Sequence, residues 1–176
     1  MLTLTYCLSQ ILLVIAYIFL GYGFQKEKRL QILTFRTIYQ ALMIIHYSLL
    51  SGIAGIIASI ISLIRNIIFI YNDKKGKNNP TWLLIFFCFI TIVLTILVYT
   101  SLADIFPCLL TLLGIYSYWS NSTKITRIVN LLISICYILY GISLNSWLII
   151  FCEFYIIINT VIGYYKYEYH KNRTEF

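Results

Sequence analysis

Seven long apolar stretches, separated by short polar breaks, make up nearly the whole chain. A helix that spans a lipid bilayer needs about 20 predominantly apolar residues, and each stretch is close to that length. The sequence therefore predicts an all-α membrane protein with seven transmembrane helices. Their expected ranges are 4–23, 30–50, 52–71, 80–99, 103–119, 124–141 and 145–165.

The composition leaves little mass for anything outside the membrane. Of the 176 residues, 61% are hydrophobic and 11% are charged, whereas a soluble domain averages about 25% charged residues. A water-soluble fold of this size cannot bury so much apolar surface, so lipid must cover it. The first stretch has no Lys or Arg ahead of it, which favours a first membrane helix over a secretory signal. We expect a single transmembrane domain over residues 1–176.

The 13 Lys and Arg residues set the expected orientation. All of them lie in, or within about two turns of, the first, third and fifth connections or the carboxyl-terminal tail. Because basic residues mark cytoplasmic loops, the amino terminus should be outside and the carboxyl terminus in the cytoplasm. The net charge of +7 has the same explanation. A nucleic-acid partner is not expected, because the chain has no basic face outside these loops.

The first three and the last three helices share a pattern of residues, at separations of 90 to 94 positions. The second helix of each triplet carries an arginine, then a carboxamide, then a tyrosine. The pairs are Arg36 with Arg127, Gln40 with Asn130, and Tyr47 with Tyr137. Two triplets in the same orientation need an odd number of spans between them, and the stretch 80–99 supplies one. The sequence predicts two parallel repeats, 4–71 and 103–165, joined by a linker helix, an architecture of transporters that bind solute near the midplane.

Several stretches of the chain resemble known membrane families. GYGFQKEKRLQIL and HYSLLSG resemble the bacterial YgjV-type inner-membrane protein family, whose function is not established, and this implies a place in the bacterial cytoplasmic membrane. The second half, from LADIFPCLLTLLG to IGYYKY, is similar to the closing triplet of PnuC-type vitamin transporters and of SWEET sugar transporters, which implies a SWEET-like fold of three, one and three helices. SWEET-type repeats carry a proline–glutamine signature in both triplets. Here only Pro107 is present, followed by Cys108, with Val14 at the equivalent point of the first helix.

Polar side chains at membrane depth are the candidate binding residues, because they are tolerated only with a partner or water. On the third helix, small and polar residues recur at helical spacing, which fits either close helix packing or cavity lining. Glu153 on the seventh helix is paired, with Gln40 or His46, or takes part in solute or proton binding, or extends outward to the interface. We expect one aqueous midplane cavity between the triplets, lined by Ser59, Asn66, Glu153, Asn159, Gln40 and Asn130.

The register of the repeat is open by one residue. A separation of 94 residues pairs Ser59 with Glu153. A separation of 93 pairs Asn66 with Asn159, which matches the SWEET pattern of asparagines that flank the solute.

Three arginines stand inside the expected helices, near their cytoplasmic ends. They are Arg36, Arg65 and Arg127. At that depth a long side chain reaches the interface with its charged end, so anchoring of the topology is the first interpretation. Attraction of an anion at an inner gate is the alternative.

These features favour a permease for a small polar solute, either a uniporter or proton-coupled. An accessory membrane subunit or an immunity-type protein without transport of its own is the alternative. An intramembrane enzyme is less favoured, since only one acid lies deep and no catalytic signature is present. The five cysteines are scattered, so no metal site and no cofactor is expected. Lipid and an unidentified solute are the expected partners, and a homo-oligomer is left open.

Overall fold

The computed structural model describes residues 2–98, 105–143 and 147–169. Within these ranges the chain forms seven α-helices and one π-helical turn, and no strand, so the all-α prediction is confirmed. The predicted break at 101–104 and residues 144–146 of the predicted break at 141–146 lie outside the described residues, whereas 141–143 belong to the sixth helix. The elements are α1 Leu2–Phe24, α2 Arg29–Leu49, α3 Ile53–Lys74, α4 Thr81–Val98, α5 Ile105–Trp119, α6 Thr123–Ser143, α7 Trp147–Tyr164 and η2 Tyr165–Tyr169.

Four helices of the described chain are long and apolar enough to cross a membrane by themselves. Their apolar segments are Leu4–Phe24, Gly55–Lys74, Thr81–Val98 and Trp147–Tyr169. The apolar segment of α5, Cys108–Trp119, is shorter. Helices are the natural choice for such segments, because lipid offers no hydrogen bonds and a helix satisfies its backbone internally. Helices α2 and α6 have 21 residues each, about 31 Å at 1.5 Å per residue, and they bury polar side chains inside the bundle.

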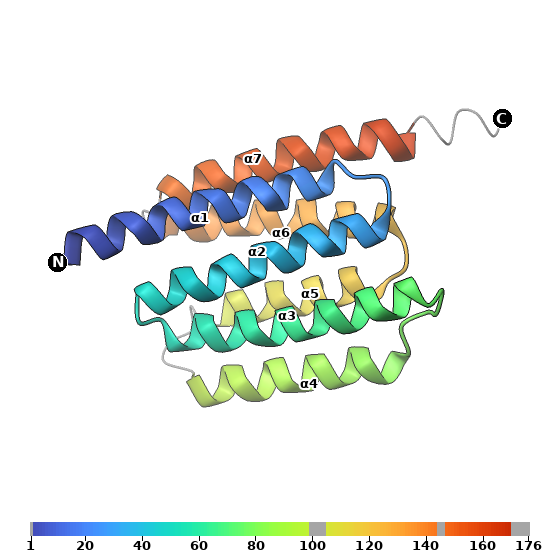
Figure 1. The fold of residues 1–176 in the computed structure, drawn as a ribbon, viewed down its shortest axis with the longest axis horizontal. Coiled ribbons are helices and arrows are strands. Elements are labelled where there is room, and N and C mark those ends of the chain that lie inside the picture. Colours follow the sequence, from blue (N-terminus) through green and yellow to red (C-terminus); the bar gives the residue numbers. More distant parts are fainter. Residues whose placement is uncertain (1, 99–104, 144–146, 170–176) are drawn as a thin grey trace.

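The helices pack side by side in an order that closes on itself. The ring runs from α1 through α2, α3, α5, α6 and α7, which packs against α1 again. Helix α4 packs outside this ring, against α3 and α5. In Figure 1, α1, α2 and α3 lie in front of α7, α6 and α5, and α4 lies at the edge beside α3. A parallel repeat relates α1 to α5 and α3 to α7. The contact between α1 and α7 therefore has an equivalent in the contact between α5 and α3. The observed contacts therefore have the symmetry that a parallel repeat requires.

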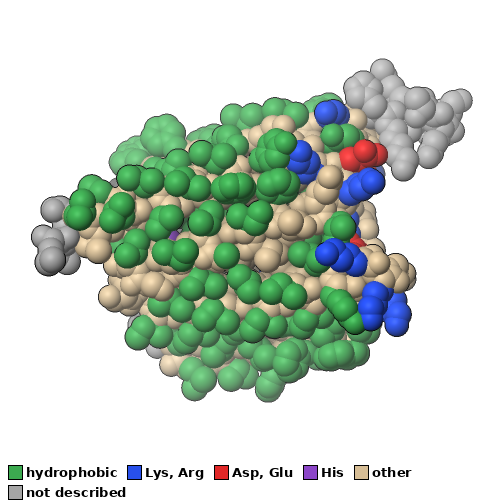
Figure 2. All heavy atoms as spheres, viewed as in Figure 1, with side chains coloured by type: hydrophobic (Ala, Val, Ile, Leu, Met, Phe, Trp, Pro, Cys, Tyr) green, Lys and Arg blue, Asp and Glu red, His purple; other side chains and the backbone are tan. Residues whose placement is uncertain are grey.

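All basic side chains on the visible face gather at one end of the bundle (Figure 2). This basic end carries the connections α1–α2, α3–α4 and α5–α6, and α7 also ends there (Figure 1). Hydrophobic side chains are spread over the rest of the visible face, among backbone and uncharged side chains (Figure 2). The largest exposed ones include Trp82, Phe89, Leu97 and Phe151, as expected where lipid replaces water.

Helices α2 and α6 begin 94 residues apart, at Arg29 and Thr123. At this separation Asn130 corresponds to Arg36, and Arg127 corresponds to Leu33. The helix starts therefore do not support the predicted pairing of Arg36 with Arg127.

The burial pattern of α3 and α7 follows the same separation. The buried residues of α3 are Ser59, Ser62, Arg65, Asn66 and Phe69. Their counterparts 94 positions later, which are Glu153, Ile156, Asn159, Thr160 and Gly163, are all buried as well. A separation of 93 would pair Arg65 and Phe69 with Ile158 and Ile162, which are both exposed. The structure thus favours the 94-residue register for the predicted repeat.

Two arginines tie the triplets together at the basic end. Arg29 of α2 donates to the carbonyl oxygens of Tyr118 and Ser120 at 2.6 and 3.1 Å, and it forms an ion pair with Asp73.

Arg127 of α6 makes the reciprocal set of bonds to the other triplet. It donates to the carbonyl oxygens of Phe24 and Lys26 at 3.3 and 2.6 Å and forms an ion pair with Glu168. Both arginines thus reach from the second helix of one triplet to the end of the first helix of the other. We call Arg29 and Arg127 the clamp arginines.

Candidate functional site

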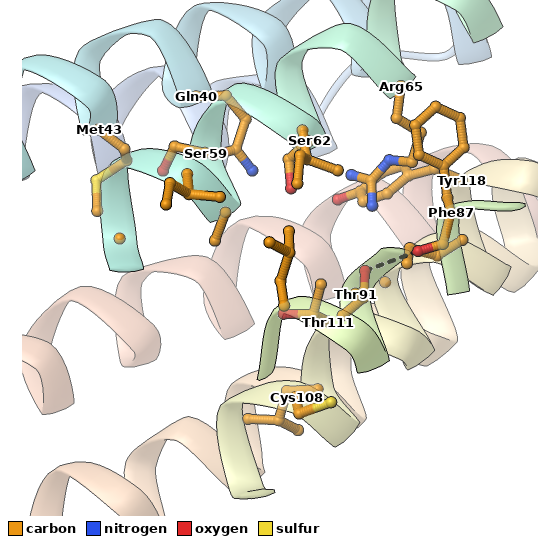
Figure 3. A pocket seen from close by; sticks show the side chains of 18 of the residues that line it. Gln40, Met43, Ser59, Ser62, Arg65, Phe87, Thr91, Cys108, Thr111 and Tyr118 are labelled. Carbon is orange, nitrogen blue, oxygen red and sulfur yellow. Dashed lines mark hydrogen bonds between the residues drawn. The ribbon is translucent and has the colours of Figure 1, made fainter. Parts of the chain in front are cut away.

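One cavity of about 340 Å³ lies between the two triplets, enclosed by α2, α3, α4, α5 and α6. Its volume is within the range of about 300–1,000 Å³ that is typical of small-molecule sites. Figure 3 shows side chains of α2 and α3 facing those of α4 and α5 across this space. The polar lining side chains are Arg36, Gln40, Ser59, Ser62, Arg65, Thr91, Thr95, Thr111 and Asn130.

The cavity runs along the bundle, and its lining differs between the two ends. Away from the basic end, its lining includes Tyr47, Gly55 and Val98, each within one turn of the end of its helix. Toward the basic end, the last lining residues of α2 and α3 are Arg36 and Arg65, about two turns or more from the ends of these helices, whereas Tyr118 lines the cavity at the end of α5.

A hydrophobic cluster closes the cavity toward the basic end. Its buried members come from α2, α3, α4 and α5, and the clamp arginines lie at the same end of the bundle. The cluster consists of Leu33, Phe69, Leu83, Phe87, Ile115 and Tyr118. The cavity therefore has a closed floor, which we call the aromatic floor after its three ring side chains.

Three of the six predicted site residues line the cavity. They are Gln40 of α2, Ser59 of α3 and Asn130 of α6. All three are buried, and Asn130 also donates to Thr160 Oγ1 at 3.4 Å. Figure 3 shows Gln40 and Ser59 side by side at the cavity wall. The sequence allowed either helix packing or cavity lining for the small and polar residues of α3. Ser59 and Ser62 line the cavity.

Glu153 is not a lining residue, and its predicted partners are wrong. The carboxylate accepts a hydrogen bond from the hydroxyl of Tyr17 at 2.8 Å and another from Ser134. Gln40 lies in the cavity wall instead, and Nδ1 of His46 is 2.8 Å from the carbonyl oxygen of Ser9. Glu153 is paired, as one of the interpretations expected, because a buried acid needs hydrogen-bond donors. The donors come from α1 and α6, whose contacts with α7 no local pattern indicates.

The two predicted asparagines are also engaged outside the cavity. Asn159 accepts a hydrogen bond from the side chain of Gln25 and donates to the carbonyl oxygen of Tyr155 at 2.7 Å. Asn66 is fully buried, and its Oδ1 accepts from Nε and Nη2 of Arg65 at 3.2 and 3.1 Å. The expectation that all six polar residues meet at one cavity is therefore wrong for Asn66, Glu153 and Asn159.

Two arginines that sequence reasoning treated first as anchors belong to the cavity wall. Arg36 and Arg65 both line it, and Arg65 is only 3% exposed. Their guanidinium carbons lie 5.4 and 5.5 Å from the centroid of the Tyr118 ring, and that of Arg36 lies 4.7 Å from the centroid of Tyr39. Arg65 continues the helical spacing of Ser59 and Ser62, at three residues each, and this spacing is the signal that could have placed it.

The chemistry of the cavity is that of binding groups. It offers guanidinium, amide and hydroxyl groups on one wall and mostly apolar side chains of α4 and α5 on the other. Among the described residues, no group of three or more His, Cys, Asp or Glu side chains is placed to hold a metal ion. The five cysteines are free thiols.

A bundle of membrane-length helices with a lipid-compatible surface and an internal polar cavity defines a multi-spanning membrane protein. A family model described as bacterial inner membrane protein, Imp-YgjV, matches residues 7–171, and the chain belongs to this family. The resemblance to the YgjV-type family is thereby confirmed. No curated protein and no solved structure matches the chain.

Proposed function

We propose that the protein is a permease for a small polar solute, and that the cavity between the triplets is its binding site. The observation that carries this proposal is the shape of the cavity. It extends from the end of the bundle opposite the basic residues to membrane depth and stops at the aromatic floor. A site that is closed toward one side of the membrane by packed side chains is what one state of alternating access requires.

The distribution of charge gives the proposed permease a direction. If the basic end is cytoplasmic, as the positive-inside rule implies, the amino terminus and the mouth of the cavity are outside. Passage to the cytoplasm then requires that the aromatic floor part and that the bonds of the clamp arginines loosen. Both sets of contacts join one triplet to the other, so a rocking motion between triplets would break them together.

The groups that line the cavity favour binding of a solute over catalysis, and we propose that the protein is not an enzyme. Whether transport is coupled to protons depends on Glu153, which is joined to the wall through aromatic residues. Tyr17 donates to Glu153, and the ring of Tyr17 packs edge-on against Tyr39 of the wall with 5.6 Å between centroids. An accessory or immunity-type subunit that only captures a ligand is the second candidate, because a cavity open to one side is enough for capture.

Cysteine accessibility from both sides of the membrane distinguishes a permease from a capturing subunit without knowledge of the solute. Ser59→Cys, in a chain whose five native cysteines are replaced, would be treated with a membrane-impermeant thiol reagent in right-side-out and in inverted vesicles. A permease exposes this position to both sides, with faster labelling from outside. A capturing subunit exposes it to one side only, which would overturn the proposal.

The matched control is Ile60→Cys in the same background. Ile60 is next to Ser59 but 40% exposed on the outer face of α3, where lipid would cover it. It should react from neither side. Labelling of Ile60→Cys at the rate of Ser59→Cys would show that the reagent enters along the lipid and not through the cavity.

A further inference from the structure

The wall of the cavity holds two arginines that form no ion pair with any acid of the described residues. Arg36 and Arg65 contact the same aromatic ring, with both guanidinium groups within 5.5 Å of the centroid of Tyr118. Among the described residues, neither has a carboxylate oxygen within 4 Å, since the ion pairs found there join Arg29 to Asp73 and Arg127 to Glu168. The Nε of Arg36 is buried and has no hydrogen-bond partner in the described part of the chain.

The clamp arginines show that this chain pairs an arginine with an acid where the arginine is structural. Each clamp arginine combines one carboxylate with two backbone carbonyl oxygens. Arg65, which is as deeply buried, has only the neutral amide oxygen of Asn66 and an aromatic ring. Glu153 is close enough to feel the charge of Arg36 but is bonded to Tyr17 and Ser134.

Aromatic contacts do not offset the burial of two positive charges. An arginine at the centre of a membrane helix costs about 2.5–3.5 kcal/mol even by lenient scales. A cation–π contact returns about 0.5–2 kcal/mol, and here two guanidinium groups share the ring of Tyr118 and repel each other. The arrangement is therefore incomplete without a negative charge or water in the cavity.

The remaining wall groups suit the oxygen atoms of an anion. Asn66 binds Nε and Nη2 of Arg65, which fixes the orientation of the guanidinium plane, and Figure 3 shows this group pointing into the space beside Ser62. The amide of Gln40 and the hydroxyl of Ser59 lie further along the same wall. Guanidinium groups match the planar geometry of carboxylate and phosphate oxygens.

We infer that the cavity binds a small anion with a carboxylate or phosphate group, held by Arg65 and Arg36 above the aromatic floor. This inference rests on the proposed function only in taking the cavity as the binding site. It assigns the class of the ligand and stands whether the ligand is transported or merely captured.

A pair of oppositely charged thiol reagents tests the inference without a known ligand. Ser62→Cys, in the chain without native cysteines, places a thiol one turn from Arg65. It would be treated with an anionic sulfonatoethyl methanethiosulfonate and with its cationic trimethylammonium counterpart. The ratio of the two rates removes any effect of the arginines on the thiol itself, because that effect is common to both reagents.

The ratio, divided by the ratio that a free thiol in solution gives, is expected to favour the anionic reagent by at least about tenfold, because a cleft lined by one sign of charge concentrates counter-ions by about 10- to 1,000-fold. Arg65→Gln should lower the ratio severalfold, and Arg36→Gln should also lower it. Lys77→Gln removes the same charge from an exposed connection and should leave the ratio unchanged. A ratio near one, or a ratio that Arg65→Gln does not alter, would overturn the inference.

Protection of the same thiol assigns the source of the anion. Inorganic phosphate or succinate that slows labelling of Ser62→Cys indicates a soluble ligand. Slowing only in nanodiscs of phosphatidylglycerol, compared with phosphatidylcholine, indicates a lipid headgroup as the anion. One-sided labelling of Ser59→Cys combined with an anion preference at Ser62→Cys would reject transport and keep the anion site, so the two proposals fail separately.

Discussion

The two triplets meet along two seams that the predicted repeat would make equivalent, yet one is closed and the other contains the cavity. In the closed seam, α1 packs against α7, the hydroxyl of Tyr17 binds Glu153, and Gln25 binds Asn159. In the open seam, α3 contacts α5 only in part, and the space between them is the cavity.

The difference begins with the size of single side chains. At the 94-residue separation, Thr111 of α5 corresponds to Tyr17 of α1. Tyr17 is buried in the core of the closed seam, whereas Thr111 lines the cavity. A threonine in place of a tyrosine leaves room where its counterpart fills the seam and supplies a donor. The comparison teaches that depth in the membrane alone does not mark a binding residue, because polar residues at similar depth fill one seam and line the cavity in the other.

The largest expected effect contrasts a clamp arginine with a cavity arginine. Arg127→Gln removes a charge that bonds Phe24, Lys26 and Glu168, and breaking a buried pair costs about 3–5 kcal/mol. Arg65→Gln should change stability by less than about 1 kcal/mol, because the lost hydrogen bonds to a neutral amide are balanced by the loss of an unpaired charge. Thermal unfolding in detergent measures both, and equal losses would contradict the distinction between the two arginines.

The next contrast uses one glycine from each seam. A Cβ atom at Gly163 would lie 2.1 Å from the carbonyl oxygen of Phe24, so the two helix backbones would have to separate. A Cβ atom at Gly114 would meet only the side chain of Ile133, at 3.9 Å. Gly163→Ala should cost about 1–3 kcal/mol, as overpacking does, and Gly114→Ala should cost close to nothing. If Gly114→Ala is the more harmful substitution, the open seam is tighter than the cavity implies.

A smaller effect is expected for the hydrogen bond that serves Glu153. Tyr17→Phe keeps the ring in place and removes the donor, which should cost about 1–2 kcal/mol for a hydrogen bond to a buried acid. In a double-mutant cycle with Glu153→Ala, the double variant should lose less stability than the sum of the two single losses, because either change removes the same bond. Strict additivity would mean that the two side chains do not interact in the membrane.

The smallest effect is expected at Ser59. Ser59→Ala should change stability by less than about 0.5 kcal/mol, because the side chain faces the cavity and removing its hydroxyl leaves no packing defect. Ser134→Ala is the matched substitution in the closed half, where the hydroxyl binds Glu153, and it should cost more. A loss at Ser59 as large as at Ser134 would favour the helix-packing interpretation of α3.

The number of helices and their positions were predictable from the sequence, because a helix in lipid is specified by its own stretch of residues. A run of apolar residues satisfies its backbone within itself, and polar breaks such as the connection before Thr81 mark its end. The location of basic residues at one end also followed, since adjacent helices joined by short connections alternate in direction (Figure 1). The partners of polar side chains did not follow, because Tyr17 and Glu153 are 136 positions apart.

The sequence by itself thus determined a seven-helix membrane protein with a basic end, and it predicted a repeat whose register was open between 93 and 94 residues. Only the tertiary structure decided that Arg65 faces a cavity while Asn159, at the equivalent position, binds Gln25. The reason is physical. Each polar side chain in lipid must find a donor, an acceptor or a cavity, and which one it finds depends on the helix packed against it.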